Sequence, residues 1–401
     1  MTLVLREYGG LELELPAEDL AYLLRLTHGD PSAGEDARVI RSIMPSGRRD
    51  TFKIAAGGYV GRMGLPSGRQ IDFESRFHTS EDMWNLILAS QHGPSAMKHL
   101  APQGSSSPFL VEVLAQAFLR EVEAIVGGGL LKGYRSRIHD RPPYAGRIDS
   151  ARHLSRFAGR PDRLVTVSRR LTADVDANQV LASAVGVLRR TPLSPLNSLR
   201  PIRIAAAFSH VQTPRMPLST LPAVRNAAPA RYRDALALAE LILRAERVAP
   251  RGAGLRGASI LFHTPRVWEN YVTRWVRSRW PLHEVRGNQR FELTARDSPA
   301  SPELWAEADT TVREFGSNQR LVALYDAKYK AITTAPSRPD IYQMVAYCER
   351  LAVNEATLVY PVATQPRAYR VGAKTVRVLG LPPPYEYMAA PVPSSGGVRW
   401  F

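Results

Sequence analysis

The sequence predicts an α+β multidomain protein with a β-rich N-terminal domain at 1–150, a helical middle at 151–250 and a C-terminal α/β region at 251–401. Two observations predict this order. Short apolar or alternating runs separated by turn residues dominate the first 75 residues, whereas long stretches of helical spacing fill the middle. Beyond residue 258, strand-like and helical segments alternate. We expect 151–401 to form one C-terminal region, with the α/β core at 251–401.

The first 150 residues are expected to hold mainly strands, and their last part links them to the middle. Apolar or alternating runs predict strands at 3–6, 11–15, 51–55, 59–63 and 70–75. Helical spacing predicts helices at 17–26, 81–90 and 108–126, with loops at 29–34 and 102–107. The arginine-rich stretch 130–149 is expected to be a basic connector, with the domain boundary near residue 150.

The rest of the chain changes from helical to mixed structure. The clearest helices of the middle are expected at 177–190 and 229–248, before a Gly/Arg-rich break at 249–257. In the last region, spacing predicts helices at 265–279 and 339–351 and strands at 305–313, 320–329, 356–362, 368–371 and 375–379.

Charge and composition limit the function. The 401 residues include 53 Lys and Arg against 37 Asp and Glu, a net charge of +16. This excess favours a polyanionic partner such as nucleic acid, although drift in a GC-rich genome would also raise arginine. The single cysteine, Cys348, excludes an internal disulfide framework or a cysteine-rich zinc site. No signal peptide, membrane-spanning run or P-loop is recognisable, so we expect a cytoplasmic protein without membrane contact or P-loop hydrolysis.

The segment LVALYDAKYK carries the sharpest chemical signal. An apolar run leads to Asp326 and Lys328, which point to the same side of a strand because they are two residues apart. A buried carboxylate and ammonium are costly unless they pair or bind something. The chain has only six lysines against 47 arginines, yet two of the six lie in this segment. Keeping lysine against this bias suggests a chemical need for a compact donor.

Two further acids could complete a metal site. Asp309 lies on the preceding expected strand, so it could share a divalent ion with Asp326. Glu269, on the expected helix before it, could be a third ligand. Such oxygen ligands suit Mg²⁺ or Mn²⁺, which would lower the pKa of a bound water and stabilise charge on a phosphate. Lys328 would position that water or neutralise developing negative charge.

Gln343 and Tyr347 lie four residues apart on one flank of the following helix. They could hydrogen-bond the lysine region or a DNA phosphate. Each of these residues alone is better explained as a surface ion pair, a turn acid or a solvated helix residue. Their combination, in the order helix Glu, strand Asp, strand Asp-x-Lys and helix Gln-x-x-x-Tyr, is far more specific and favours a metal-dependent phosphodiesterase.

This order resembles the core of the PD-(D/E)XK nucleases, here Glu269, Asp309 and Asp326-Ala327-Lys328 with the helix that carries Gln343 and Tyr347. More closely, the chain resembles the McrC family, the nuclease subunits of McrBC-type restriction systems. DAKYK followed by DIYQMVAY is similar to that family's DxKYK…DxYQMxAY. Further collinear likenesses run from about residue 3 to about 365: YVGRMGLPSGRQIDF, LLKGYRSR…YAGRID, and LTADVDANQVL with Asp174 and Asn178.

The sequence departs from the family pattern at several positions. Ala308 replaces the proline before Asp309, Ser75-Arg76 replaces a common Pro-Lys pair, and Ala145 replaces the first arginine of RGRI. The acid itself remains in the first case. Residues 370–401 extend beyond the motifs that can be matched.

The resemblance implies an endonuclease subunit that acts with an AAA+ McrB-like GTPase hexamer. That partner would read modified double-stranded DNA, while the N-terminal domain of this chain would enter the ring and stimulate its NTPase. Candidate ring contacts are the hairpin at 59–75 and the loop at 35–50. Two alternatives stay open: a non-cleaving activator of an AAA+ ring, and a stand-alone repair nuclease.

Overall fold

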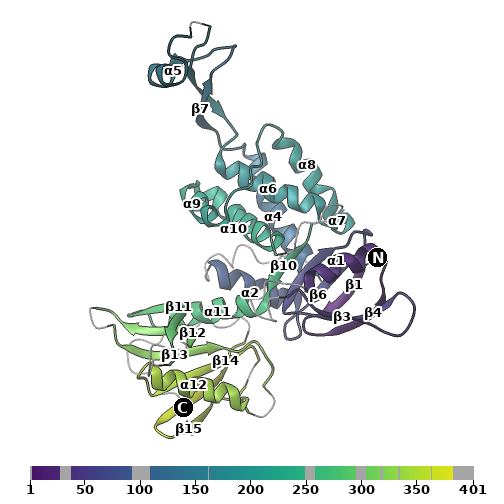
Figure 1. Ribbon diagram of the computed structural model, residues 1–401, viewed down its shortest axis with the longest axis vertical. Helices are drawn as coiled ribbons and strands as arrows, with labels where there is room; N and C mark the ends of the chain where they lie inside the picture. The colour runs from purple at the N-terminus through teal and green to yellow at the C-terminus, as the bar shows by residue number, and fades with distance from the viewer. Residues whose placement is uncertain are drawn as a thin grey trace. The chain divides into compact units, whose positions relative to one another are not determined.

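The computed structural model describes residues 2–27, 38–92, 109–160, 162–248, 258–294, 304–316, 319–332, 335–362 and 364–382 (Figure 1). The chain is a mixed α/β protein with several sheets, and it divides into two compact units. The first contains Met1–Val113, Ala249–Leu255 and Leu261–Phe401, and the second contains Leu114–Val248 and Arg256–Ile260. The compact units therefore do not divide near residue 150.

Two sheets of the first unit are built mainly from N-terminal residues. One has the strand order β1-β6-β5-β10, with β1 parallel to β6 and β6 antiparallel to β5. The other is antiparallel, with the order β2-β4-β3. The strands are β1 (Thr2–Arg6), β2 (Gly10–Glu14), β3 (Ile40–Pro45), β4 (Thr51–Ala56), β5 (Tyr59–Gly64), β6 (Gln70–Glu74) and β10 (Ile260–His263). The helices here are α1 (Ala17–Thr27) and α2 (Ser80–His92).

Strand β10 explains why N-terminal and C-terminal residues share one unit. It adds an edge strand to the N-terminal sheet and leads directly into α11 (Thr264–Arg279). Helix α11 packs against α2, and the Arg274 guanidinium donates to the carbonyl oxygens of Ser90 and Gln91 in α2. The boundary expected at residue 150 overlooked these contacts because they join segments far apart in the sequence.

A six-stranded sheet forms the C-terminal part of the first unit, in the order β11-β12-β13-β14-β16-β15. Helix α11 packs against β11, β12 and β13, and α12 packs against β14 and β16. In β13, Tyr325 contacts the Trp275 and Trp280 side chains of the α11 segment, whereas Leu324 packs in a core with α12. Because neighbouring strand residues point to opposite faces, the two helices cover opposite faces of this sheet (Figure 1). The elements are β11 (His283–Glu292), β12 (Trp305–Glu314), β13 (Leu321–Ala327), α12 (Arg338–Arg350), β14 (Glu355–Tyr360), β15 (Arg367–Val371) and β16 (Lys374–Gly380).

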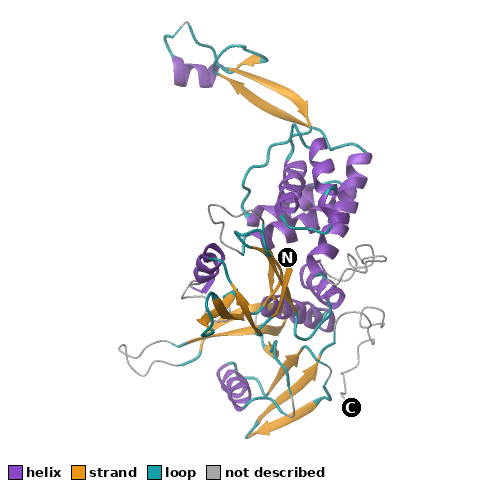
Figure 2. Ribbon diagram, turned by 90° about the vertical axis from the view of Figure 1, so that its right-hand side faces the viewer, coloured by secondary structure: helices purple, strands orange, loops and turns teal. Residues whose placement is uncertain are grey.

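The second unit is mostly helical, with one small sheet (Figure 2). Helix α6 packs against α8, α9 and α10. The sheet is antiparallel with the order β7-β9-β8. Helix α4 (Leu110–Gly127) begins in the first unit and continues into the second. The other elements are β7 (Gly133–His139), β8 (Arg147–Ile148), α5 (Ser150–Phe157), β9 (Thr166–Thr172), α6 (Asp176–Arg190), α7 (Pro195–Ser198), α8 (Arg200–Ala207), η3 (Leu218–Thr220), α9 (Leu221–Ala227) and α10 (Ala230–Glu246).

Several expectations need correction. The basic connector expected at 130–149 contains β7 and β8, and the candidate ring-contact loop at 35–50 contains β3. Strands β9, β10 and β11 were not expected at all. The other expected elements are present within a few residues of their predicted bounds. The loops expected at 29–34 and 102–107 and the break at 249–257 lie outside the described residues.

The expected hairpin at 59–75 is held inside the first unit. Every residue of β5 is buried. The turn that follows is clamped by Asp19 of α1, whose carboxylate accepts from the Ser67 amide and hydroxyl and from the Arg69 guanidinium. The LPSGR sequence therefore serves the fold, and contact of this hairpin with a ring stays a prediction.

A buried ion triad joins this hairpin to α4. Arg62 of β5 donates to both Asp72 carboxylate oxygens, at 2.6 and 2.9 Å, and to Glu112 Oε1 at 2.7 Å. All three residues are buried. Removing one member of such a group leaves buried charge without compensation.

None of the helices in the described part of the chain combines the length and the apolar character that a membrane span requires.

We predict that Arg62→Met lowers the free energy of unfolding by about 3–5 kcal/mol, because the Asp72 and Glu112 carboxylates lose their cation. Urea unfolding followed by circular dichroism measures this loss. Arg49→Met is the control, since the Arg49 side chain is 97% exposed, and it should cost less than about 0.5 kcal/mol. Similar small losses for both variants would contradict the structural role of the triad.

Candidate active site

Asp309 and Asp326 come together on adjacent antiparallel strands, with Asp309 in the middle of β12 and Asp326 near the end of β13. The register of β12 and β13 pairs Thr310 with Tyr325, so Asp309 and Asp326 follow one position beyond this pair. Asp326 is only 2% exposed. The Ala327 amide donates to Asp309 Oδ2 at 2.7 Å, and this hydrogen bond fixes the Asp309 carboxylate against the end of β13. The predicted apposition of the two acids on neighbouring strands is confirmed.

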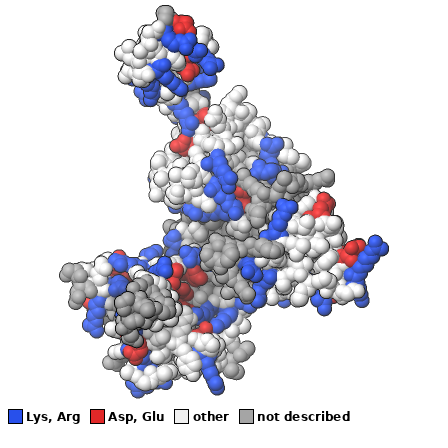
Figure 3. Space-filling model, viewed as in Figure 1, with Lys and Arg blue, Asp and Glu red and all other residues white. Residues whose placement is uncertain are grey.

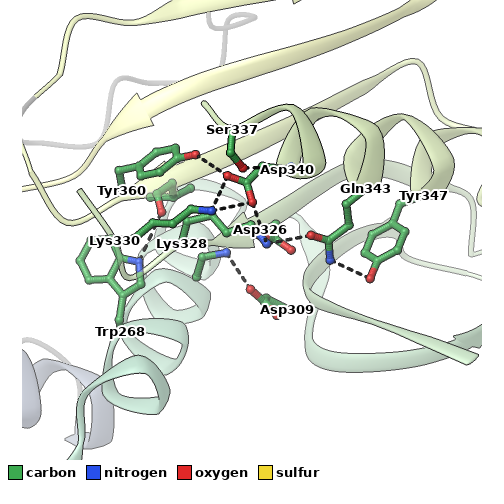
Figure 4. A network of polar contacts seen from close by, with 12 residues as sticks. Trp268, Asp309, Asp326, Lys328, Lys330, Ser337, Asp340, Gln343, Tyr347 and Tyr360 are labelled. Atoms are coloured by element: carbon green, nitrogen blue, oxygen red, sulfur yellow. Dashed lines mark hydrogen bonds and ion pairs between the residues drawn. The ribbon is translucent and has the colours of Figure 1, made fainter. Parts of the chain in front are cut away.

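Lys328 lies directly after β13 and begins a chain of polar contacts (Figure 4). Its Nζ is 2.7 Å from Asp326 Oδ2 and donates to Gln343 Oε1 at 2.9 Å. Gln343 Nε2 in turn donates to Tyr347 Oη at 2.9 Å. Tyr347 is buried, edge-on to the Phe291 ring. Gln343 therefore contacts Lys328, as expected from the sequence. Tyr347 does not contact the lysine itself but orients Gln343 from the protein interior.

Burial and neighbouring carboxylates raise the pKa of both acids. Burial, with the neighbouring Asp326 carboxylate as the next cause, raises the pKa of Asp309 to about 8. Burial also raises the pKa of Asp326, although Lys328 opposes this shift. For Lys328 itself, burial alone would lower the pKa, but the carboxylates of Asp326 and Asp340 raise it above its usual value. Lys328 is therefore a fixed cation, suited to stabilising negative charge rather than to accepting a proton.

Glu269 lies near Asp326 but does not form a three-residue metal-binding group with the two aspartates. Burial raises its pKa, and repulsion from Glu307 and Asp326 contributes. Its Oε2 pairs with Arg266 Nη1 at 3.2 Å on the same helix. Among the residues that the structure describes, no three His, Cys, Asp or Glu side chains converge into a metal-binding group. The geometry thus joins Asp309 and Asp326 but leaves Glu269 outside the pair.

The donor set fits a hard divalent cation. Within the described ranges, Asp326 Oδ2 is buried and has no hydrogen-bond donor apart from its ion pair with Lys328. The Asp326 carboxylate raises the pKa of Asp309, and a bound cation would offset this repulsion. Carboxylate oxygens are the ligands that Mg²⁺ and Mn²⁺ prefer, and both ions use few protein ligands and keep several waters.

Sequence reasoning missed Asp340, which supports the site from α12. Its carboxylate is 2.6 Å from Lys330 Nζ and 4.0 Å from Lys328 Nζ, and it accepts from the Tyr360 hydroxyl at 3.3 Å. Burial alone would raise the pKa of Asp340, but hydrogen bonds with Lys330 and Ser337 lower it. The sequence signal was Ser337-x-x-Asp340 at a helix start, which predicts only a helix cap.

Comparison with known proteins identifies the family. The family described as McrBC 5-methylcytosine restriction system component matches residues 54–361, more than half of the chain. The chain belongs to the McrBC restriction-system family. A comparison with curated proteins finds no match to this McrBC component.

Solved structures with a similar fold come from a McrBC assembly. One belongs to a refined half-complex of Thermococcus gammatolerans McrB AAA+ hexamers with bound McrC: it has a TM-score of 0.61 at 17% identity and covers 98% of this chain and 96% of its own. Another, from the Thermococcus gammatolerans McrBC complex, has a TM-score of 0.44 at 15% identity, covering 70% of this chain and 88% of its own. The first likeness shows that this McrBC component shares its fold over nearly the whole length.

We predict that Asp309→Asn raises the melting temperature of the metal-free chain, and that the gain grows with pH. Between the ordinary pKa of 3.8 and the folded-state value of about 8, folded Asp309 keeps a proton that the unfolded chain releases. The wild type therefore loses stability as pH rises through this window, whereas asparagine does not. Calorimetry in EDTA should show a gain of about 1 °C at pH 5 and of several degrees at pH 8.5.

Asp340→Asn is the matched control for this experiment. The pKa of Asp340 is lowered, so its carboxylate stabilises the folded state above the unfolded pKa, and the substitution should lower the melting temperature at both pH values. A pH-independent effect of Asp309→Asn would contradict the raised pKa of Asp309.

Proposed function

We propose that this chain is the metal-dependent DNA endonuclease subunit of a McrBC-type restriction complex. It hydrolyses phosphodiester bonds when assembled with an AAA+ GTPase hexamer that reads modified double-stranded DNA, and it stimulates that NTPase. The observation that carries the nuclease proposal is the contact set of buried Asp326 with the partly buried Asp309 and Lys328, supported by Gln343. Membership of a restriction-system family and a net charge of +16 support DNA as the substrate.

Asp309 and Asp326 would hold Mg²⁺ or Mn²⁺, with Glu269 as a further candidate ligand. When bound, the cation would supply positive charge against the scissile phosphate and lower the pKa of a water there. The protein's own part is to present two carboxylates rigidly, through the Ala327 amide and the strand register. Rigid presentation avoids reorganisation during the reaction.

Lys328 would stabilise the negative charge that develops on the phosphate. Its ammonium is held between Asp326 and Gln343, and Tyr347 fixes the Gln343 amide in turn. Because its pKa is raised, the ammonium keeps its charge at neutral pH. The Lys328 ammonium would also orient the attacking water toward phosphorus. Asp340 would keep Lys330 paired beside Lys328.

Asp326→Asn or Lys328→Ala should lower DNA cleavage by about 100-fold or more, because each removes charge needed in the transition state. The measurement is Mg²⁺-dependent cleavage of methylated DNA by the chain reconstituted with its AAA+ partner. Stimulation of the partner's NTPase should remain, since neither side chain would contact the ring.

The control is Lys53→Ala, which removes another of the six lysines from an exposed position on β4. It should leave cleavage unchanged. Full cleavage by either site variant would contradict the assignment of the site. Ring stimulation with no cleavage by the wild type would favour the activator hypothesis, and cleavage without any partner would favour a stand-alone nuclease.

The second unit offers a surface for the ring partner. We call the sheet β7-β9-β8 together with α5 the arm. Tyr134 of β7 and Leu171 of β9 are directly paired, and their side chains are 68% and 55% exposed. Ile138 lies on the same face of β7 and is also exposed. Figure 3 shows Lys and Arg side chains gathered over the arm.

Exposed apolar side chains on a small sheet are typical of interaction sites, because three strands need a covered face for stability. The structural neighbour comes from an assembly of McrB hexamers with bound McrC. We therefore assign the apolar face of the arm, rather than the buried hairpin at 59–75, to contact with the AAA+ ring.

The double variant Tyr134→Ser/Leu171→Ser should reduce stimulation of the partner's NTPase by about 10-fold or more, because buried aromatic and aliphatic anchors dominate interface energies. Titration of the ring with each variant measures the effect. Leu196→Ser is the control in the same unit, since Leu196 is 87% exposed on α7. Equal stimulation by the double variant and the wild type would exclude the arm as the ring contact.

A further inference from the structure

The carboxylate of Glu7 is buried where N-terminal and C-terminal segments of the first unit meet. The residue follows β1 and is only 1% exposed. Its Oε1 accepts hydrogen bonds from the Ser75 hydroxyl at 3.0 Å, the Arg76 amide at 2.9 Å and the Tyr329 hydroxyl at 2.9 Å. Its Oε2 accepts from the hydroxyl of Thr264, the first residue of α11. One carboxylate thus ties three distant segments together.

Tyr329, which directly follows Lys328, is held through both its side-chain hydroxyl and its backbone carbonyl oxygen. Its hydroxyl contacts Glu7 and Ser75, while its carbonyl oxygen accepts from Arg76 Nη2 at 2.7 Å. Its ring packs edge-on against Phe77, with centroids 5.2 Å apart. Regular pairing of β13 ends at Ala327, so the backbone at Lys328 and Tyr329 depends on contacts beyond the strand. The Lys328 amide donates to the Val359 carbonyl oxygen and the Lys328 carbonyl oxygen accepts from the Lys330 amide, while Glu7 and Arg76 hold Tyr329.

The Arg76 guanidinium is fixed by aromatic rings on both sides. Its Cζ lies 4.3 Å from the Tyr8 ring centroid and 4.5 Å from that of Phe77. Tyr8 has a φ of +56°, which is costly for a bulky residue. A Cβ at Gly58 would lie only 2.3 Å from the Tyr8 hydroxyl oxygen, so the absence of a side chain at Gly58 leaves room for the Tyr8 ring. The strained backbone therefore presents both Glu7 and the ring that covers Arg76.

We propose that Glu7 and Arg76 are positioning residues for the nuclease site, which hold Tyr329 and through it set the place of the Lys328 ammonium. The inference rests on the proposed nuclease function. Both residues lie in the N-terminal part of the chain, more than 250 positions before the lysine. They act on Tyr329 through its hydroxyl and its carbonyl oxygen. The N-terminal sheet would then be part of the catalytic apparatus as well as of the fold.

The test measures kcat and KM for cleavage of methylated DNA by the full chain with its AAA+ partner and Mg²⁺. Glu7→Ala and Arg76→Met should each lower kcat by about 10–100-fold, because displacing a catalytic group by about 1 Å has effects of this size. KM and NTPase stimulation should stay within about twofold of wild type, since DNA and ring contacts are untouched. Glu7→Gln keeps an acceptor oxygen and should recover most of kcat.

Asp19→Asn is the matched control, because Asp19 is also a buried carboxylate that accepts from a serine, an amide and an arginine in the same unit. It should lower stability without lowering kcat. If Glu7→Ala does not fold, Tyr329→Phe decides the question: it removes only the hydroxyl and should lower kcat by about 10-fold. Wild-type kcat in Tyr329→Phe and Arg76→Met would overturn the positioning role.

Wild-type and Asp326→Asn chains run beside these variants. If the wild type does not cleave, or if Asp326→Asn does, the proposed nuclease function fails. If the wild type cleaves, Asp326→Asn does not and the Glu7 and Arg76 variants keep full kcat, only the positioning role fails.

Discussion

The close approach of the Asp309 carboxylate to buried Asp326 is the constraint to which the surrounding residues are fitted. Strand register brings the two carboxylates together, and burial makes their charges costly. The Ala327 amide and the Lys328 ammonium offset part of this cost, and Gln343 and Asp340 hold the ammonium where it offsets most. A pair of acids that is costly without a cation is well suited to bind one, so the same feature that weakens the fold supports the proposed chemistry.

The core of the site could be predicted from sequence because its determinants are local. Alternation along a strand places Asp326 and Lys328 on one side, and helical spacing places Gln343 and Tyr347 on one flank. Contacts between distant segments could not be predicted in this way: nothing in the spacing pairs Glu7 with Tyr329 or adds β10 to the N-terminal sheet. Strands β7 and β11 were missed because their many charged and polar residues mask the apolar alternation on which strand prediction depends.

Several motifs that suggested the family serve the fold and not the chemistry. Ser67 and Arg69 of the LPSGR turn bind Asp19. Asn178 donates to the carbonyl oxygens of Leu131 and Ala173 and accepts from Tyr232, so it joins the segment before β7 to two helices. A resemblance carried by such residues identifies a shared architecture, whereas the case for catalysis depends on the few residues at the end of β13.

Binding of Mn²⁺ to the isolated chain, followed by electron paramagnetic resonance, tests the central claim most directly. The account predicts one ion per chain at the acid pair, lost in Asp326→Asn and retained in Lys53→Ala. Unchanged Mn²⁺ binding by Asp326→Asn would contradict the claim that the Asp309 and Asp326 carboxylates form the metal site.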